Sequence, residues 1–194
     1  KIMVEYTDPN PFKPFHIGHL MSNAIGESIS RLLEFSGAKI SRVNYQGDIG
    51  LHVAKTVYGL LQNTKLQSRT GLNNLQAANI GRAYALGAGL YETDKKVKSE
   101  IDAINKKIYL KSDQKINEIY DWGFKVTMDA FQDLYEMLGT EFDFYFLESQ
   151  MALIGERIVK DNLDKMIDVP DSKMIFKKSD GAIVFKAEKY DAKL

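Results

Sequence analysis

Two histidines lie three positions apart in the segment HIGH, where His16 and His19 flank Gly18. If a helix begins near His16, both imidazoles fall on one face of its first turn. The same turn presents unpaired backbone N–H groups and the positive end of the helix dipole, which attract phosphate. Gly18 has no side chain, so a flat ring or a phosphate can approach the backbone closely, and Lys13 adds a positive charge nearby. These residues predict a polyphosphate site.

A metal site is the other chemistry that paired histidines suggest. The sequence has one further histidine, His52, and contains no HExxH pattern, so we predict no metal site built from side chains. Magnesium that arrives with a nucleotide is compatible with the motif, because Mg²⁺ is often held mainly by phosphate oxygens and water.

The histidine pair needs a strand, a loop and a helix to position it, and the sequence predicts all three. Residues 2–6 (IMVEY) are typical of a short strand, and the prolines of DPNPFKP exclude helix and stiffen the loop after it. Apolar residues at helical spacing predict a helix over residues 17–35, with Gly37 as its stop. Residues 38–46 predict a second strand, ended by the turn GDIG. The resulting βαβ unit puts the histidines at the carboxyl end of the first strand, where open α/β sheets bind nucleotides.

Helical periodicity dominates the middle of the chain. The predicted helices cover residues 73–91, 94–110 and 112–139. Ser112 is the expected N-cap of the last helix, with Asp113 in its first turn, and Gly139 is expected to end it. Beyond it, the sequence predicts a strand over 142–147, a helix over 149–166, and a hairpin over 172–187 that turns at Ser-Asp-Gly. The fold class is therefore α/β with a mainly helical middle.

The composition is that of an ordinary globular protein, with 44% hydrophobic and 27% charged residues among 194. Cysteine is absent, which excludes disulfides and thiolate metal sites and fits a reducing compartment. Twenty-six basic residues balance 26 acidic residues, whereas a nucleic-acid-binding protein usually has a basic excess. The lysines of residues 95–115 are matched by nearby acids, which is typical of a solvated helix face.

Both ends of the sequence are abrupt. Strand-like residues begin at once after Lys1, and the sequence stops at Leu194, soon after another strand-like run. We therefore expect a segment of a longer protein, and the alternative is a complete small protein with a processed start.

The stretch that contains HIGH resembles the arginyl-tRNA synthetase family of class I aminoacyl-tRNA synthetases. Residues 4–19 (VEYTDPNPFKPFHIGH) fit the family pattern V-E-[YF]-x-x-P-N-x-x-K-x-x-H-x-G-H, and residues 44–50 (NYQGDIG) fit N-[HY]-x-G-D-x-G. These motifs are dense over the first fifty-odd residues. After Tyr58 the likeness is looser and includes LGTEFDFYFLES and SDGAIVF.

The resemblance implies a fold, an activity and partners. The fold would be the first half of a class I Rossmann-like nucleotide-binding domain over residues 1–58, a mainly helical insertion over 59–170, and a strand or hairpin return over 171–194. The activity would be that of an arginine--tRNA ligase, which uses ATP with Mg²⁺ to make arginyl-adenylate and then transfers arginine to tRNA(Arg). The family further implies a cytoplasmic enzyme without a membrane segment, and we expect a monomer.

The resemblance also implies residues that hold the amino acid. Glu5 and Asn10 match positions that bind the substrate arginine, whose guanidinium and ammonium groups offer only hydrogen-bond donors. Asp8, Pro9 and Asn10 would lie along the amino acid, and His16 would contact it as well. The family more often has a small residue at the position of Asp8.

The residues implied for ATP are Lys13, His16, Gly18 and His19. The two histidines would stabilise charge on the α-phosphate and on the departing pyrophosphate as the carboxylate of arginine attacks, and Gly18 would lie under the adenosine. Lys13 would substitute for a lysine that many arginyl enzymes lack in the second class I signature loop. Gln46, Gly47 and Asp48 line the same end of the sheet without an assigned role.

Two other functions remain open at this point. An adenylyltransferase of the same fold class also places H-x-G-H at a helix start after a strand and a "DP" turn. A nucleotide-binding module without catalysis is the non-enzyme alternative. The helical insertion and the spacing of Glu5 and Asn10 favour the synthetase. We expect no aminoacylation by this segment alone, because half of the ATP site would lie elsewhere.

Overall fold

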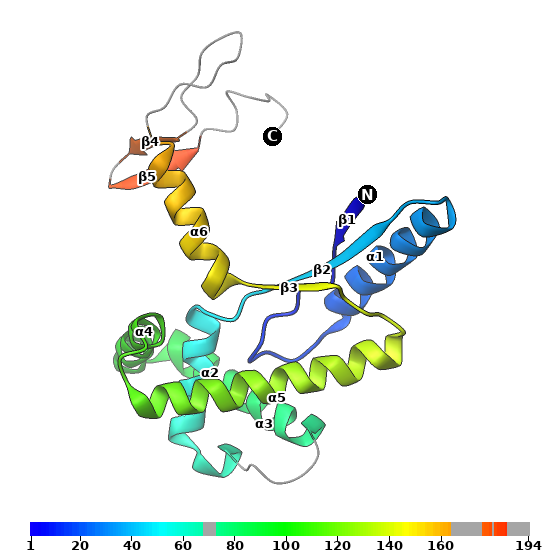
Figure 1. Ribbon diagram of the computed structural model, residues 1–194. Coiled ribbons are helices and arrows are strands. Elements are labelled where there is room, and N and C mark those ends of the chain that lie inside the picture. The colour runs from blue at the N-terminus through cyan, green and yellow to red at the C-terminus, as the bar shows by residue number, and fades with distance from the viewer. Residues whose placement is uncertain (68–72, 164–175, 180, 186–194) are drawn as a thin grey trace. The chain divides into compact units, whose positions relative to one another are not determined.

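The computed structural model describes residues 1–67, 73–163, 176–179 and 181–185 (Figure 1). The chain divides into two compact units, Lys1–Ser149 and Gln150–Leu194. The candidate site residues predicted from the sequence all belong to the first unit.

A three-stranded parallel sheet organises the first unit. Its strands are β1 (Ile2–Glu5), β2 (Ile40–Gln46) and β3 (Phe144–Leu147), in the order β1-β2-β3. Val43 of the central strand pairs with Glu5 on one side and with Phe144 on the other. The three strands therefore present their carboxyl ends at one edge, which is where the sequence analysis expects the site.

Helix α1 (Ile17–Phe35) joins β1 to β2, so the predicted βαβ unit and its α/β class are confirmed. The helix ends as predicted near Gly37, whose φ of +90° is a backbone conformation that favours glycine. The N–H of Gly37 bonds to the carbonyl of Glu34, and the N–H of Ala38 bonds to that of Leu33. These two bonds satisfy carbonyls of the last turn and direct the chain into β2.

Four further helices and a short 3-10 helix form the helical layer of the first unit. They are α2 (Leu51–Gln62), η1 (Thr64–Gln67), α3 (Asn73–Thr93), α4 (Lys95–Leu110) and α5 (Gln114–Leu138). Their apolar faces meet in one core, in which Val53, Leu60 and Ile101 are completely buried. Helices α2 and α3 lie so close that a Cβ added at Gly59 would stand 2.1 Å from the carbonyl oxygen of Ala83. A glycine is required at this contact.

The start of α5 differs from the prediction. Asp113, not Ser112, is the N-cap, and its carboxylate accepts the N–H of Ile116 at 3.2 Å. Ser112 instead takes part in the C-terminal cap of α4. Lys111 adopts a left-handed conformation, and the N–H of Ser112 bonds to the carbonyl of Lys107. The end of α5 is as predicted, with Gly139 in the left-handed region at φ 65°.

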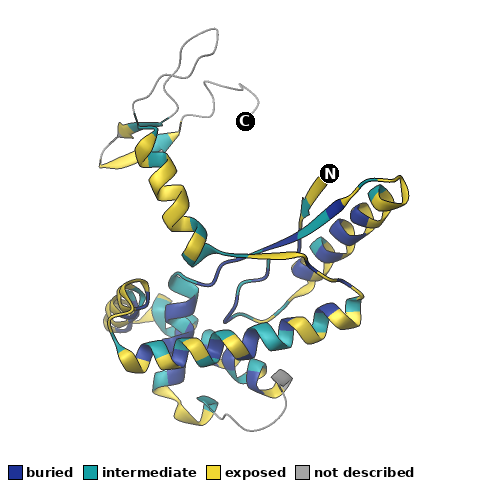
Figure 2. Cartoon of the chain, viewed as in Figure 1, coloured by how far each residue is buried: buried dark blue, intermediate teal, exposed yellow. Residues whose placement is uncertain are grey.

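Helix α1 turns a polar face inward. The residues that it buries are His19, Asn23, Gly26, Glu27 and Ser30. The apolar residues whose spacing predicts the helix lie mostly on its outer side, and Figure 2 shows this face as a yellow stripe. Met21, Ile25 and Leu32 are 64%, 51% and 66% exposed.

In the second unit, helix α6 (Glu148–Asp161), which starts at the end of the first unit, is followed by strands β4 (Phe176–Ser179) and β5 (Ala182–Phe185). The strands pair antiparallel as the predicted hairpin, and Ser179 pairs with Ala182 across the turn. Helix α6 ends at Asp161, before the predicted end at residue 166, and residues 164–166 lie outside the described residues. The predicted domain boundaries at 58/59 and 170/171 stay predictions. Within the described parts of the chain, no helix is both long and apolar enough to cross a membrane.

Candidate active site at the carboxyl edge of the sheet

The two histidines of HIGH close the first turn of α1 on themselves. His16 is the N-cap in an extended conformation, and its Nδ1 accepts the N–H of Gly18 at 3.1 Å. The Nδ1 of His19 reaches back and accepts the N–H of His16 at 3.3 Å. This reciprocal pair is a capping box made of two imidazoles. The rings stack with centroids 3.7 Å apart at an interplanar angle of 18°.

These bonds indicate which nitrogen of each ring carries the proton when the ring is neutral. A ring nitrogen that accepts a hydrogen bond carries no proton, so the proton of each neutral imidazole is on Nε2. The pKa of His19 is lowered to about 4, first by burial and then by the neighbouring charges of His16 and Lys13. His19 is therefore neutral at neutral pH and offers Nε2–H as a donor to an oxygen anion.

Lys13 lies close enough to His19 for its charge to contribute to the lowered pKa of that ring. Its ammonium is 5.3 Å from the ring centroid of Tyr84, a cation–π contact from α3. Its charge also contributes to lowering the pKa of His52, for which burial is the larger cause. His52 belongs to the first turn of α2, and its Nε2 contacts the carbonyl oxygen of Gly47 at 2.8 Å. His52 and Tyr84 thus both lie near Lys13. Neither was predicted from the sequence to belong to the site.

Phe12 anchors the loop that carries Lys13 in the helical layer. Its side chain is completely buried and its φ is +67°. Its N–H bonds to the hydroxyl of Thr127 in α5, and its carbonyl accepts the hydroxyl of Thr56 in α2. A Cβ at Gly123 would lie 2.5 Å from the Phe12 ring, so α5 leaves room for that ring. The helical core therefore sets the position of the loop on either side of Phe12.

Asp8 has a local structural contact. Its Oδ1 accepts the N–H of Tyr45 in β2 at 2.7 Å, while Thr7 and Asp8 both have positive φ. Burial raises the pKa of Asp8, the Tyr45 bond lowers it, and the charge of Glu5 raises it. The carboxylate tightens the loop against the central strand. Its predicted contact with arginine stays a prediction.

A group of hydrogen-bond acceptors lies at the carboxyl edge of the sheet. Glu5 ends β1, and Glu148 follows β3 directly. A Cβ added at Gly47 would lie 2.3 Å from Oδ1 of Asn10 and 3.1 Å from Oε2 of Glu148, so Gly47 leaves space for both side chains. The pKa of Tyr45 is raised first by burial and then by the charges of Glu148, Asp48 and Glu5, so the phenol of Tyr45 lies within the influence of all three carboxylates.

Glu148 is the site residue that the sequence analysis missed. Its signal is its position directly after the strand FYFL, because residues at the carboxyl ends of parallel strands meet at one edge. Among the residues predicted for the site, Pro9 is buried within the loop, and Gly18 lies exposed at the start of α1. Gln46 is buried, and its amide contacts Oδ1 of Asn44 at 3.4 Å.

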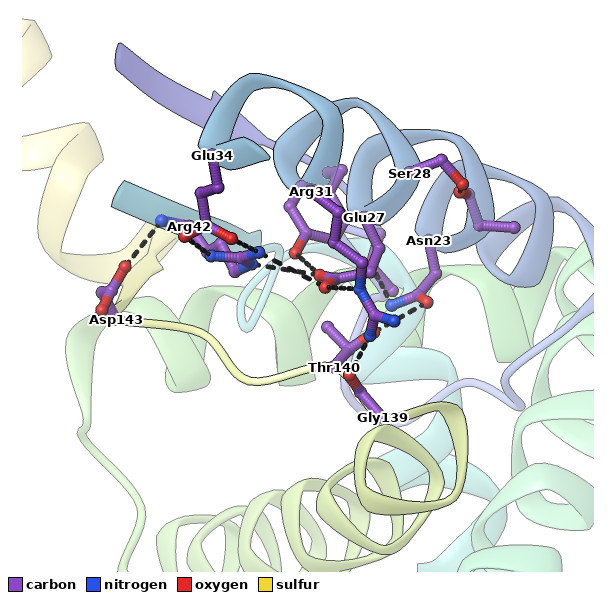
Figure 3. A network of polar contacts seen from close by, with 12 residues as sticks. Asn23, Glu27, Ser28, Arg31, Glu34, Arg42, Gly139, Thr140 and Asp143 are labelled. Carbon is purple, nitrogen blue, oxygen red and sulfur yellow. Dashed lines mark hydrogen bonds and ion pairs between the residues drawn. The ribbon is translucent and has the colours of Figure 1, made fainter. Parts of the chain in front are cut away.

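A network of charged side chains holds the buried face of α1 against β2 and the end of α5 (Figure 3). Glu27 accepts from Arg31 at 2.7 Å and from Arg42 at 3.1 Å, and it also accepts the hydroxyl of Tyr6. Burial raises the pKa of Glu27, but the bonds from Tyr6, Arg31 and Arg42 outweigh it and hold the pKa below its ordinary value. Arg31 also donates to the carbonyl of Gly139 at 2.7 Å. The network fixes α1, and with it the histidines, relative to the sheet.

The edge therefore has two chemically distinct sides. Donors and positive charge from Lys13, His16 and His19 suit phosphate oxygens, whereas Glu5, Asn10 and Glu148 suit a cationic side chain or an ammonium group. Among the residues that the structure describes, no group of three His, Asp or Glu side chains could hold a metal ion. A magnesium ion at this edge would depend on oxygens of a bound nucleotide.

The whole chain, residues 1–194, matches the family model described as tRNA synthetases class I (R), catalytic domain. An arginine--tRNA ligase of Borreliella burgdorferi is 31% identical over 190 residues, covering 94% of this chain and 30% of that protein. One of Clostridium perfringens is 29% identical over 192 residues, covering 98% of this chain and 32% of that protein. The chain thus spans about a third of the length of these relatives.

Solved structures show the same fold. The arginyl-tRNA synthetase of Thermus thermophilus matches with a TM-score of 0.67 at 22% identity, over 97% of this chain and 30% of that one. The enzyme of Plasmodium falciparum matches with a TM-score of 0.58 at 22% identity, over 94% of this chain and 30% of that one.

Proposed function

This chain belongs to the family of class I tRNA synthetase (R) catalytic domains, and we propose from this premise that it is the part of an arginine--tRNA ligase that binds ATP and arginine. The reaction joins a carboxylate oxygen of arginine to the α-phosphorus of ATP and releases pyrophosphate. The resulting arginyl-adenylate then gives its arginyl group to tRNA(Arg). In this proposal the enzyme acts in the cytoplasm as a monomer, and residues 59–170 are an insertion between 1–58 and 171–194.

One observation carries the proposal. The two imidazoles of α1 and the acceptor group around Gly47 lie at the same sheet edge, and a single loop, held by Phe12, connects them. Because the Nε2–H groups and the Lys13 ammonium are donors, they bind phosphate oxygens and stabilise the charge that grows as pyrophosphate leaves. Because Glu5, Asn10 and Glu148 are acceptors, they orient a guanidinium and an ammonium. Magnesium bound to the nucleotide would neutralise phosphate charge further.

Arginine-dependent exchange of radiolabelled pyrophosphate into ATP tests the proposal. The assay uses a polypeptide of the relatives' length that contains this chain, with tRNA(Arg) present. Two variants keep the helix cap while removing an imidazole: His16→Asn retains an N-cap acceptor, and His19→Gln retains the N3 partner of a capping box. We expect each to lower the exchange rate by roughly 100-fold, the typical cost of one lost transition-state donor.

Other outcomes separate the alternatives. Exchange that does not require arginine would favour an adenylyltransferase. Calorimetric binding of ATP that depends on His16 and is accompanied by no exchange would favour a nucleotide-binding module. ATP binding that neither variant weakens would place the nucleotide away from α1 and overturn the assignment of HIGH.

A further inference from the structure

Asp48 is a buried carboxylate at the centre of three hydrogen bonds. It is 1% exposed and belongs to the turn after β2. Its Oδ1 accepts the N–H of Ser149 at 2.8 Å. Its Oδ2 accepts the hydroxyl of Ser149 at 2.6 Å and the hydroxyl of Tyr120 at 3.0 Å. These donors come from the start of α6 and from α5, so one side chain joins segments far apart in the sequence.

The bonds to Ser149 act on Glu148, its neighbour in the chain. Asp48 holds both the backbone N–H and the hydroxyl of Ser149 in the first turn of α6, where a negative charge also suits the helix dipole. The direction in which Glu148 leaves that turn is thereby fixed. Glu148 extends toward Gly47, the residue directly before Asp48, and Oδ1 of Asn10 also lies against Gly47. One turn therefore both leaves room for Glu148 and holds its backbone.

The bond to Tyr120 links this arrangement to the helical layer. Burial raises the pKa of Tyr120 far above the physiological range, and the charge of Asp48 raises it further, so the phenol remains a donor. The Tyr120 ring lies 5.4 Å from the ring of Phe12, centroid to centroid. Phe12 anchors the loop of Asn10 and Lys13. The same tyrosine thus touches the supports of both Glu148 and the loop.

We propose that Asp48 is a positioning residue that orients Glu148 toward the arginine side chain, and that Tyr120 couples this subsite to the helical layer. The inference rests on the proposed function and deepens it by naming what holds the guanidinium subsite in place. Asp48 itself makes no contact with the substrate in this account. Its effect should therefore appear in the recognition of arginine and not in that of ATP.

The experiment measures pyrophosphate exchange in the same polypeptide of the relatives' length, with arginine and with citrulline, its uncharged isostere. In Asp48→Asn the amide accepts at one oxygen only, so at least one Ser149 donor loses its partner. We expect the KM for arginine to rise roughly 10- to 100-fold, as for a misplaced contact group, and the KM for ATP to stay within about twofold. The ratio of kcat/KM for arginine to kcat/KM for citrulline should fall by roughly tenfold.

Tyr120→Phe should raise the KM for arginine roughly threefold, the typical effect of one hydrogen bond.

A double variant tests whether Asp48 acts through Glu148. If it does, the arginine KM of the double variant Asp48→Asn/Glu148→Gln should exceed that of Glu148→Gln alone by less than about twofold. The effects of two residues that act through one another are not additive. A matched control is Tyr91→Phe, which removes the 3.1 Å bond to Asp102 between α3 and α4, another tyrosine–aspartate contact that involves neither Asp48 nor Ser149. It should leave both KM values unchanged.

Each failure has its own signature. Equal rises in KM for arginine and ATP, or additive effects in the double variant, would mean that Asp48 is only structural. If Asp48→Asn does not fold, the Tyr120→Phe variant tests the proposal instead. An arginine KM of Tyr120→Phe equal to that of the parent polypeptide would overturn it. A parent polypeptide without arginine-dependent exchange would overturn the proposed function, and this inference with it.

Discussion

Helices α1 and α2 each follow a strand of the same sheet and begin at the same edge, yet they bury opposite kinds of residue. Helix α2 buries an apolar face that includes Val53 and Leu60. Helix α1 buries Asn23 and Glu27 and leaves large apolar residues such as Leu32 in solvent. The two helices are therefore held in place by different forces.

The difference between the buried faces of α1 and α2 distinguishes contacts that stabilise the fold from contacts that set an orientation. Helix α2 contributes to the apolar core that it shares with α3, α4 and α5, and burial of this kind is energetically large but not directional. Helix α1 is fixed by directed contacts, among them Glu27 with Arg42 and Asn23 with Thr140. Such contacts contribute less net free energy but define an orientation. We infer that the helical layer stabilises the unit, whereas the contacts of α1 orient the histidines.

The largest effect is expected in the helical layer. Ile101 of α4 is completely buried in the apolar core. Ile101→Ala should lower the free energy of unfolding by about 3–5 kcal/mol, because the substitution removes transfer free energy and leaves a cavity. Urea denaturation of the 194-residue chain measures the loss. Lys106→Ala, on the exposed side of the same helix, is the control and should change stability by less than about 0.5 kcal/mol. A loss below about 1 kcal/mol for Ile101→Ala would show that the helical layer is not the stabilising part.

The next effect concerns pH and the buried face of α1. The pKa of His19 is about 4 in the folded chain against an ordinary value of 6.5. As the pH falls below 6.5, the unfolded chain takes up a proton at His19 before the folded chain does, so stability is lost progressively down to about pH 4. The loss attributable to His19 should reach about 2–3 kcal/mol.

His19→Gln removes this titration while keeping the N3 partner of the cap. The free energy of unfolding of the variant, measured by urea denaturation between pH 7 and 4, should fall less steeply than that of the parent chain. The pKa of His52 is also lowered, so His52 lowers the stability of the parent chain and of His19→Gln alike as the pH falls. The difference in slope between the two curves of unfolding free energy against pH therefore reports His19. Parallel curves would mean that His19 is not shielded from protonation.

The sequence predicted the elements well but did not indicate which face of α1 is buried. Periodicity located α1 from Ile17 to Phe35, and turn residues located its end and the β4–β5 hairpin. These signals are local, and helical spacing alone does not show which side of a helix is covered. The polar face of α1 is buried because Glu27 meets Arg42 from β2, a contact between distant segments.

The candidate site shows the same contrast between local signals and contacts of distant segments. The motif placed Lys13, His16 and His19 together because they are close in the sequence and share one turn or the loop before it. Glu148 was missed because it reaches the edge only through the pairing of β3 with β2, after more than ninety intervening residues. The N-cap of α5 was placed one residue early because Ser112 and Asp113 are both good caps, and the end of α4 decides between them.

The smallest effect should come from the outer face of α1, and it tests the comparison most directly. Ile25 is 51% exposed and Leu32 is 66% exposed, so each keeps half or more of its surface in water on folding. Alanine also has a higher helix propensity than isoleucine, which offsets the remaining loss. Ile25→Ala should therefore change the free energy of unfolding by less than about 0.5 kcal/mol, in contrast to Ile101→Ala, which changes the same residue type at a buried position of α4. A loss above about 1.5 kcal/mol, or one that depends on protein concentration, would mean that this face is covered in solution and that α1, like α2, is held by apolar burial.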